Sequence, residues 1–85
     1  GLAFKPNIDD LRESPALLVA NSLLKEDVCE LILVEPNLKE SDEYHLVDFN
    51  RANEDADIIV FLVAHKQFRN LKINKIALDF CGIKQ

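Results

Sequence analysis

Two short, uninterrupted apolar runs constrain the fold of this chain more than any other feature. They are residues 31–34 (LILV) and 58–63 (IIVFLV), and both are rich in β-branched side chains. Runs of this length without polar alternation are typical of parallel strands that are covered on both faces. We therefore expect both segments to be buried strands, with residues 58–63 at the centre of a sheet.

Helix-start signals lie between and before these runs. Ser14 followed by Pro15 predicts a helix over residues 14–26, with Ser14 as the N-cap and Pro15 at the first helical position. A second, shorter helix is expected to begin at Asp48 or Asn50 and to end just before the run at 58–63. The chain therefore alternates strand and helix signals.

Weaker signals complete this alternation. Residues 1–4 resemble the end of a strand that stops before Pro6, residues 44–47 predict a third strand, residues 64–68 a short helical turn and residues 76–80 a final strand. Alternating strands and helices predict an α/β fold, here a doubly wound, Rossmann-like parallel sheet of about five strands in a three-layer α/β/α arrangement. We expect a single domain over the whole chain, with its first strand truncated, as a fragment of a larger protein.

Composition limits the partners. The 85 residues carry a net charge of −5 and no cluster of Lys and Arg, so neither nucleic acid nor an anionic membrane surface is an expected partner. The longest apolar run is far shorter than the roughly 20 residues of a membrane span. Cys29 and Cys81 lack CxxC spacing and a nearby His, so we expect no metal site and two buried free thiols in a reducing cytoplasm.

Ligands of doubly wound sheets gather at the carboxyl ends of the strands, and two known kinds of site lie at that edge. A dinucleotide-binding half would use Glu35 for a ribose hydroxyl, but residues 5–14 contain no glycine, whereas such a site needs a GxGxxG-like turn. His65 also follows a strand, and we expect it to be a partly exposed loop histidine.

A receiver-like phosphoacceptor module is the alternative of a different class. Asp9 and Asp10 after the first strand, Asp48 after the third and Lys84 after the last resemble its acidic pocket and lysine. Asp9 lies several residues beyond the strand end, however, and His65 stands where such a module has a hydroxyl residue. The resemblance to a phosphoacceptor module therefore fails at these positions.

The opening 16 residues carry the most specific signal. They read GLAFKPNIDDLRESPA and fit the pattern GxAFKxxxxDxRxSPA. This stretch resembles the signature that opens the C-terminal, UDP-binding domain of the UDP-glucose/GDP-mannose dehydrogenase family. Shorter matches follow at residues 35–37, 55–57 and 65–68, so the resemblance spans nearly the whole chain. Residues 7–10, 34–37 and 63–68 are most similar to the branch of the family that acts on UDP-N-acetyl-D-mannosamine.

The resemblance implies an NAD-dependent enzyme that oxidises C6 of a UDP-sugar to a carboxylate through a thiohemiacetal on a catalytic cysteine, for surface polysaccharide synthesis. UDP-N-acetyl-D-mannosamine is the implied substrate and UDP-glucose the alternative. The family's NAD-binding domain, central domain and catalytic cysteine lie before this region, and Cys29 and Cys81 match none of them. We therefore expect NAD to be held mainly elsewhere, the isolated chain to be inactive, and the intact cytoplasmic enzyme to be a homodimer or larger homo-oligomer.

Site residues follow from the resemblance position by position. Phe4 and Lys5 match the pair that contacts the UDP-sugar, where a ring walls the site and an ammonium reaches phosphate or sugar oxygens. Arg12 matches the arginine that reaches toward NAD. Asp10 is expected to brace Arg12 and the loop, and Ser14 to cap the helix, so neither is expected to touch a ligand. Without the motif, Lys5 and Arg12 would be interpreted as solvated or locally paired loop charges.

Overall fold

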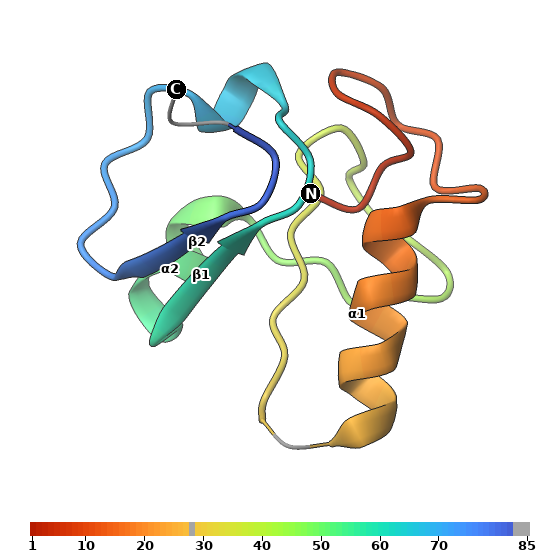
Figure 1. Ribbon diagram of the computed structural model, residues 1–85, viewed down its shortest axis with the longest axis horizontal. Coiled ribbons are helices and arrows are strands. Elements are labelled where there is room, and N and C mark those ends of the chain that lie inside the picture. The colour runs from red at the N-terminus through yellow and green to blue at the C-terminus, as the bar shows by residue number, and fades with distance from the viewer. Residues whose placement is uncertain (28, 83–85) are drawn as a thin grey trace.

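The computed structural model describes residues 1–27 and 29–82 (Figure 1). Two helices, two strands and one 3₁₀ turn follow one another along the described residues. In chain order they are α1 (Pro15–Glu26), α2 (Phe49–Asp55), β1 (Ile58–Phe61), η1 (Lys66–Phe68) and β2 (Ile76–Asp79). The predicted α/β class and the predicted positions of both helices are thus confirmed.

The sheet is small and parallel. β1 pairs with β2 so that Ile58 lies opposite Ile76, and in a separate parallel bridge Leu33 lies opposite Leu46. The described residues contain this two-stranded sheet and this bridge, so about five strands in three layers are not confirmed. Residues 1–4 form no strand here, because the N–H groups of Leu2 and Ala3 donate to a side chain instead of a neighbouring strand.

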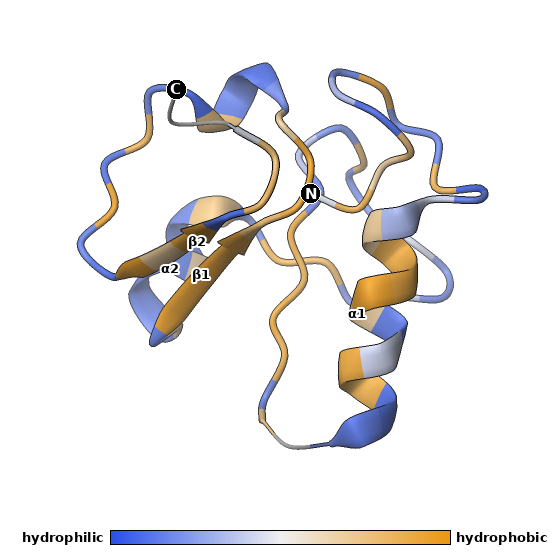
Figure 2. Ribbon diagram, in the orientation of Figure 1, coloured by the Kyte–Doolittle hydropathy of each residue, from blue (hydrophilic) through white to orange (hydrophobic). Residues whose placement is uncertain are grey.

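The prediction that residues 58–63 form a wholly buried central strand is wrong. Phe61 is buried, but Ile58 is 53% and Val60 40% exposed, because one face of β1 packs on a core and the other does not. Residues 31–34 are likewise only partly buried, with Leu33 inside. Figure 2 shows the apolar residues concentrated on β1, β2 and the segment that contains Leu33.

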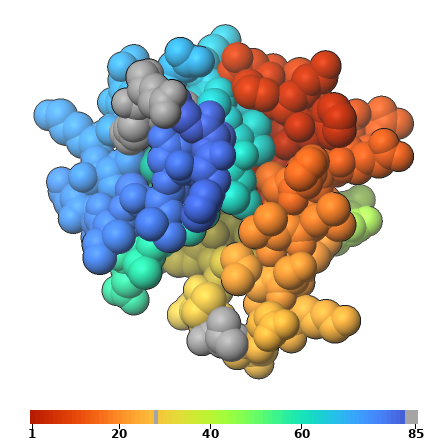
Figure 3. Space-filling view, in the orientation of Figure 1, coloured from red at the N-terminus to blue at the C-terminus, as the bar shows by residue number. Residues whose placement is uncertain are grey.

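Two apolar clusters support the fold. The first contains Leu2, Ala20 from α1 and Leu33. The second contains Phe61 and Phe68, whose rings meet edge to face with centroids 5.5 Å apart. The N-terminal residues, which contribute Leu2 to the first cluster, lie against the segment that follows β1 (Figure 3).

Gly1 is required by this close approach. A β-carbon at Gly1 would lie 2.9 Å from Val63 Cβ and 3.2 Å from His65 Cδ2, closer than side-chain atoms pack. The first glycine of the motif therefore has a packing role: it lets the N-terminal residues reach the chain that leaves β1.

Helix α1 begins where the sequence predicts. Ser14 is its N-cap, and Ser14 Oγ accepts from the Leu17 N–H at 3.2 Å and donates to the Leu2 carbonyl at 2.6 Å. Ser14 is buried, so its hydroxyl joins the helix to the N-terminal residues as well as capping it. Asp48 caps α2 in the same way, accepting from the Arg51 N–H.

The expectation of two buried thiols is wrong. Cys29 is exposed, because it lies in the surface connection that follows α1, and Cys81 is half-buried; neither forms a disulfide among the described residues. Within residues 1–27 and 29–82, neither helix has the length and apolar character needed to cross a lipid bilayer.

We predict that Ser14→Ala lowers the free energy of unfolding by about 1–3 kcal/mol, because it removes a helix cap and leaves a buried carbonyl without its donor. Urea denaturation followed by circular dichroism measures this. Ser22→Ala, an exposed change on the same helix, is the matched control and is expected to stay within about 0.5 kcal/mol of wild type. Equal effects of the two substitutions would contradict the prediction.

Candidate functional site

The motif residues lie on one exposed loop, residues 4–12, which we call the motif loop. The Phe4 N–H donates to the Asp10 carbonyl at 2.8 Å and closes its base. Asn7 at the tip has a left-handed backbone, with φ at 65°. Phe4 is 47% exposed and Lys5 is exposed, so both side chains are accessible to a ligand.

Arg12 is held by Asp10. Arg12 Nε and Nη2 donate to the two carboxylate oxygens of Asp10 at 3.1 and 3.0 Å, and the Arg12 backbone N–H donates to the same side chain at 2.9 Å. These bonds to Arg12 lower the pKa of the Asp10 carboxyl, and Asp10 in turn raises the pKa of the guanidinium. The Arg12 side chain remains 88% exposed, so the pair orients a permanent positive charge toward solvent.

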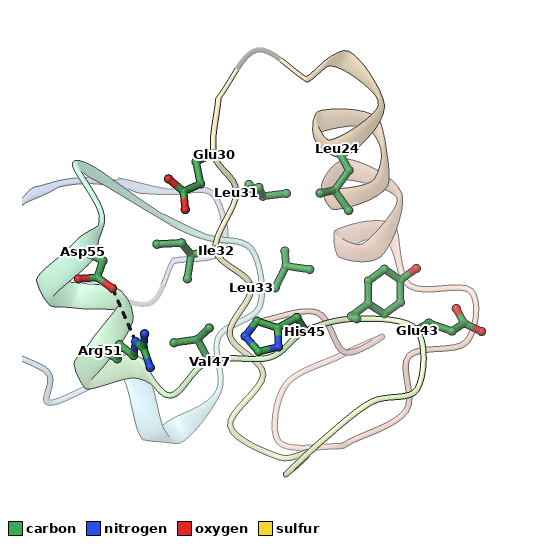
Figure 4. Close-up of a pocket in the computed structure, with 11 residues that line it drawn as sticks. Leu24, Glu30, Leu31, Ile32, Leu33, Glu43, His45, Val47, Arg51 and Asp55 are labelled. Carbon is green, nitrogen blue, oxygen red and sulfur yellow. Dashed lines mark ion pairs between the residues drawn. The ribbon is translucent and has the colours of Figure 1, made fainter.

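Two shallow pockets differ in their chemistry. A pocket of about 490 Å³ lies against the motif loop and is lined by Phe4, Asp10, Arg12 and Glu13. A larger one, about 660 Å³, is lined by residues 30–33, 43–45 and 47, by Leu24 of α1 and by two residues of α2, Arg51 and Asp55 (Figure 4).

The larger pocket is poorly suited to an anionic ligand. Glu30, Glu43 and Asp55 contribute carboxylates to its lining, and Asp55 already pairs with Arg51 at 3.8 Å (Figure 4). A phosphate group would meet net negative charge there. The lining of the motif-loop pocket also has more carboxylates, on Asp10 and Glu13, than guanidinium groups, but this pocket lies against the loop that carries Phe4, Lys5 and Arg12, and it is the candidate site for that reason.

A buried, hydrogen-bonded pair of side chains, Glu35 and His65, lies directly behind the motif loop. His65 Nε2 is 2.8 Å from Glu35 Oε1, and both side chains are fully buried. The same Glu35 oxygen accepts from the Leu2 and Ala3 N–H groups at 2.8 and 3.0 Å, and the other oxygen accepts from the Asn37 N–H at 2.9 Å. Four donors thus bind one buried carboxylate, and their hydrogen bonds offset the free-energy cost of removing its charge from water.

The other nitrogen of His65 faces the motif loop. The Asn7 N–H donates to His65 Nδ1 at 2.9 Å, and Asn37 Nδ2 lies 3.2 Å from the same atom. Because a backbone N–H can only donate, Nδ1 is the acceptor and carries no proton. The ring is therefore neutral, with its proton on Nε2 directed at Glu35.

Amide side chains extend this connection. Asn7 Oδ1 accepts from the Lys66 N–H at 2.7 Å, and Asn37 Nδ2 donates to the Ile8 carbonyl at 2.9 Å. Gln67 Nε2 in turn donates to Asn37 Oδ1 at 2.6 Å. The motif loop is thereby joined to the chain after residues 31–34 and to the chain after β1.

Opposing effects act on the pKa of Glu35. Burial raises it, but the N–H groups of Asn37 and Leu2 and the His65 ring stabilise the carboxylate more strongly, so the pKa lies below its ordinary value of 4.5. The carboxylate stays charged at neutral pH. It acts as the acceptor around which the N-terminal residues are arranged.

The structure brings Phe4, Lys5, Asp10 and Arg12 together on the motif loop, with Ser14 at its end. The prediction that His65 is a partly exposed loop histidine is wrong, because its exposed fraction is 0%. The sequence alone predicts no role for Asn7 and no pairing of Glu35 with His65. The available signal was that both residues follow strand-like runs, since carboxyl ends of parallel strands meet at one edge.

The two alternatives lose support. Asp48, the central acid of a phosphoacceptor, caps α2 with its side chain, and Lys84 lies outside the described residues. Glu35 is buried against backbone N–H groups and does not present its carboxylate to a ribose. The described residues also contain no group of three or more His, Cys, Asp or Glu side chains placed to hold a metal ion.

Comparison with known proteins gives consistent matches. Residues 1–81 match the UDP-binding domain of the UDP-glucose/GDP-mannose dehydrogenase family. The chain is 41% identical to a UDP-N-acetyl-D-mannosamine dehydrogenase of Campylobacter jejuni over 95% of its length, and 47% identical to one of Yersinia pestis over 85%. It is 39% identical over 89% to an NDP-N-acetyl-D-galactosaminuronic acid dehydrogenase of Ralstonia nicotianae.

These matches concern part of each relative. The chain spans about a fifth of the length of the three proteins, namely 21%, 18% and 19%. No solved structure gives a significant match.

We predict that Glu35→Gln makes the free energy of unfolding depend less on pH in the acid range. A carboxyl whose folded pKa is lowered contributes stability that is present above its ordinary value of 4.5 and is lost as the pH falls through the folded value. Wild type should therefore be more stable than the variant at neutral pH, by about 1–3 kcal/mol, and this advantage should shrink on acidification. Urea denaturation between about pH 7 and pH 3 measures the difference.

Glu40→Gln, an exposed carboxylate change, is the control and should follow the wild-type profile. A wild-type advantage over Glu35→Gln that stays constant across this range would count against the prediction.

Proposed function

Since this chain belongs to the UDP-glucose/GDP-mannose dehydrogenase family, as its UDP-binding domain, we propose that the parent protein is an NAD-dependent dehydrogenase that oxidises C6 of UDP-N-acetyl-D-mannosamine to the uronic acid. The exposed motif loop beside a charged, shallow pocket is the observation that carries this proposal. The names of the matched relatives, which concern N-acetylated sugars, favour this substrate over UDP-glucose. The product would serve surface polysaccharide synthesis.

Lys5 and Phe4 are proposed to bind the UDP-sugar. An exposed ammonium at the start of the loop can reach the pyrophosphate oxygens, because Lys acts as a flexible point charge on a long stem. The half-exposed ring of Phe4 lines the adjoining pocket and offers an apolar wall. Neither residue carries out chemistry on the sugar. Their proposed work is to hold the substrate in place.

Arg12 is proposed to reach toward NAD. NAD, when bound, supplies the acceptor for the hydride that leaves the sugar carbon. The residues of this chain fit a single contact to NAD, from Arg12. Residues 5–14 contain no glycine that would bring backbone N–H groups close to the pyrophosphate of the cofactor. The exposed guanidinium, oriented by Asp10, suits such a contact across a domain boundary. The main NAD site and the catalytic cysteine would belong to other domains.

The doubly wound sheet of about five strands in three layers is proposed for the complete domain. The first of two supporting observations concerns residues 31–34. The Val47 N–H donates to the Leu33 carbonyl at 2.9 Å. In a parallel pair, alternate residues direct both backbone groups to the same side, so those of Ile32 and Val34 face the opposite edge.

The second observation concerns β1. The Phe80 N–H donates to the Phe61 carbonyl at 3.1 Å, so the backbone groups of Ile58 and Val60 face away from β2. Both strand pairs are parallel, as the flanks of one further parallel strand would be. We propose that an extended segment of the parent protein occupies this position and leads into Gly1, so that residues 1–85 are its C-terminal UDP-sugar-binding domain.

The parent protein is further proposed to be a cytoplasmic homodimer or larger homo-oligomer. Its partners within one chain would be the NAD-binding and central domains. The exposed Cys29 thiol, which forms no disulfide, supports a reducing compartment. The exposed apolar face formed by Ile58, Val60 and the β2 residue Leu78 supports contact with further protein.

We predict that Lys5→Ala in the full-length parent protein weakens the use of UDP-sugar by about 10- to 150-fold, because a charge-assisted contact to phosphate contributes about 1.5–3 kcal/mol. Steady-state kinetics with UDP-N-acetyl-D-mannosamine and isothermal titration with UDP measure the effect. Thermal unfolding should barely change, since Lys5 is exposed. Lys25→Ala, at the exposed end of α1, is the control, and a change of less than twofold for Lys5→Ala would refute the role.

For Arg12, the expected defect is in NAD dependence. Arg12→Ala should raise the KM for NAD more than the KM for UDP-sugar, and Arg12→Lys should restore only part of the loss, since an ammonium cannot reproduce the planar two-donor geometry. Kinetics at saturating UDP-sugar and varied NAD separate the two. Full recovery by lysine, or an unchanged KM for NAD in both variants, would show that Arg12 is a solvated loop charge.

A further inference from the structure

Hydrogen bonds within the motif loop do not hold its tip. Its base is closed by the bond between Phe4 and Asp10, but Asn7 at the tip is exposed and has a left-handed backbone that non-glycine residues adopt at a cost. Lys5 lies two residues before this tip. The backbone of Lys5 thus lies between the closed base at Phe4 and the tip, and its position depends on the bonds that hold Asn7 as well as on the base.

Two bonds from one short segment hold the tip. His65 Nδ1 accepts the Asn7 N–H at 2.9 Å, and the neighbouring Lys66 N–H donates to Asn7 Oδ1 at 2.7 Å. His65 itself is fully buried, and Phe68 lies against its ring with centroids 5.7 Å apart. A ring enclosed in this way cannot rotate to follow a moving loop.

Glu35 fixes which nitrogen of His65 faces the loop. Its carboxylate lies 2.8 Å from Nε2 and requires a donor there, which leaves Nδ1 as the acceptor for Asn7. A proton on Nδ1 would place two N–H groups against each other at a distance of 2.9 Å between their nitrogens. The loop tip is thus held by a neutral ring with a single tautomer.

We propose that His65, oriented by Glu35, is a positioning residue for nucleotide binding: its neutral imidazole fixes the tip of the motif loop and thereby the position of Lys5. This inference rests on the proposed function, because it needs Lys5 to bind the UDP-sugar. His65 has no exposed surface and does not touch a ligand, so its effect passes through Asn7. A role confined to stability would require only that the buried pair be satisfied.

Two substitutions at His65 separate these roles in the full-length parent protein. His65→Asn places a carbonyl oxygen near the position of Nδ1 and keeps an acceptor for Asn7, but leaves Glu35 without its donor. His65→Gln reaches Glu35 with an amide N–H but removes the acceptor for Asn7. We expect both to lower the thermal midpoint, while only His65→Gln weakens UDP binding in isothermal titration, by about 10-fold.

Asn7→Gly provides a test that leaves the buried pair unchanged. Glycine adopts the left-handed backbone readily, so this variant removes only the bond between Asn7 Oδ1 and the Lys66 N–H. We expect UDP binding to weaken about 3- to 10-fold with the thermal midpoint unchanged. The bond from the N–H of residue 7 to His65 Nδ1 remains in this variant, so it tests the step from the loop tip to Lys5, and unchanged binding would overturn that step and with it the proposal. If both histidine variants fail to fold, the tautomer of the His65 ring decides whether its Nδ1 holds the loop.

Nuclear magnetic resonance of the ¹⁵N-labelled histidine ring reports the tautomer of His65 independently of the stability of the protein. We expect the Nδ1 resonance of His65 in the unprotonated range and Nε2 in the protonated range, both with and without UDP. Equal affinities of His65→Asn and His65→Gln for UDP, or the opposite tautomer, would overturn the proposal. Lys5→Ala identifies which idea has failed: if it leaves UDP binding unchanged the proposed function is wrong, and if it weakens binding while His65→Gln does not, only the positioning role is wrong.

Discussion

The carboxylate of Glu35 is the interaction on which the rest of this structure depends. It accepts from the N-terminal backbone, from the Asn37 N–H and from the His65 ring. A buried charge is tolerated only when its lone pairs are satisfied, so each of these donors is held in place by the others. The N-terminal residues need no strand ladder here because this side chain binds them.

The candidate site uses this arrangement without being part of it. Charges that could meet a ligand, on Lys5 and Arg12, are exposed, whereas the groups that hold their loop are buried or half-buried. Such a division lets the ligand-facing side chains be flexible while the loop backbone is fixed by hydrogen bonds to neighbouring strand ends. Asp10 does the same locally for the guanidinium of Arg12.

The sheet shows where local sequence reasoning stops. An uninterrupted apolar run predicts a strand covered on both faces, yet β1 exposes Ile58 and Val60. An apolar run shows that a strand needs cover on both faces, but the residues of the run do not specify which other segments cover it. The same reason explains why residues 31–34 make one bridge through Leu33 and no ladder.

Sequence by itself determined the α/β class, the start of α1 at Ser14-Pro15 and the short α2, because caps, proline and apolar periodicity act within a few residues. The motif also marked the loop that carries Lys5 and Arg12. Only the tertiary structure decided that His65 is buried and neutral and that Glu35 faces it. Those two residues are 30 positions apart, and their pairing depends on how the ends of separate segments meet.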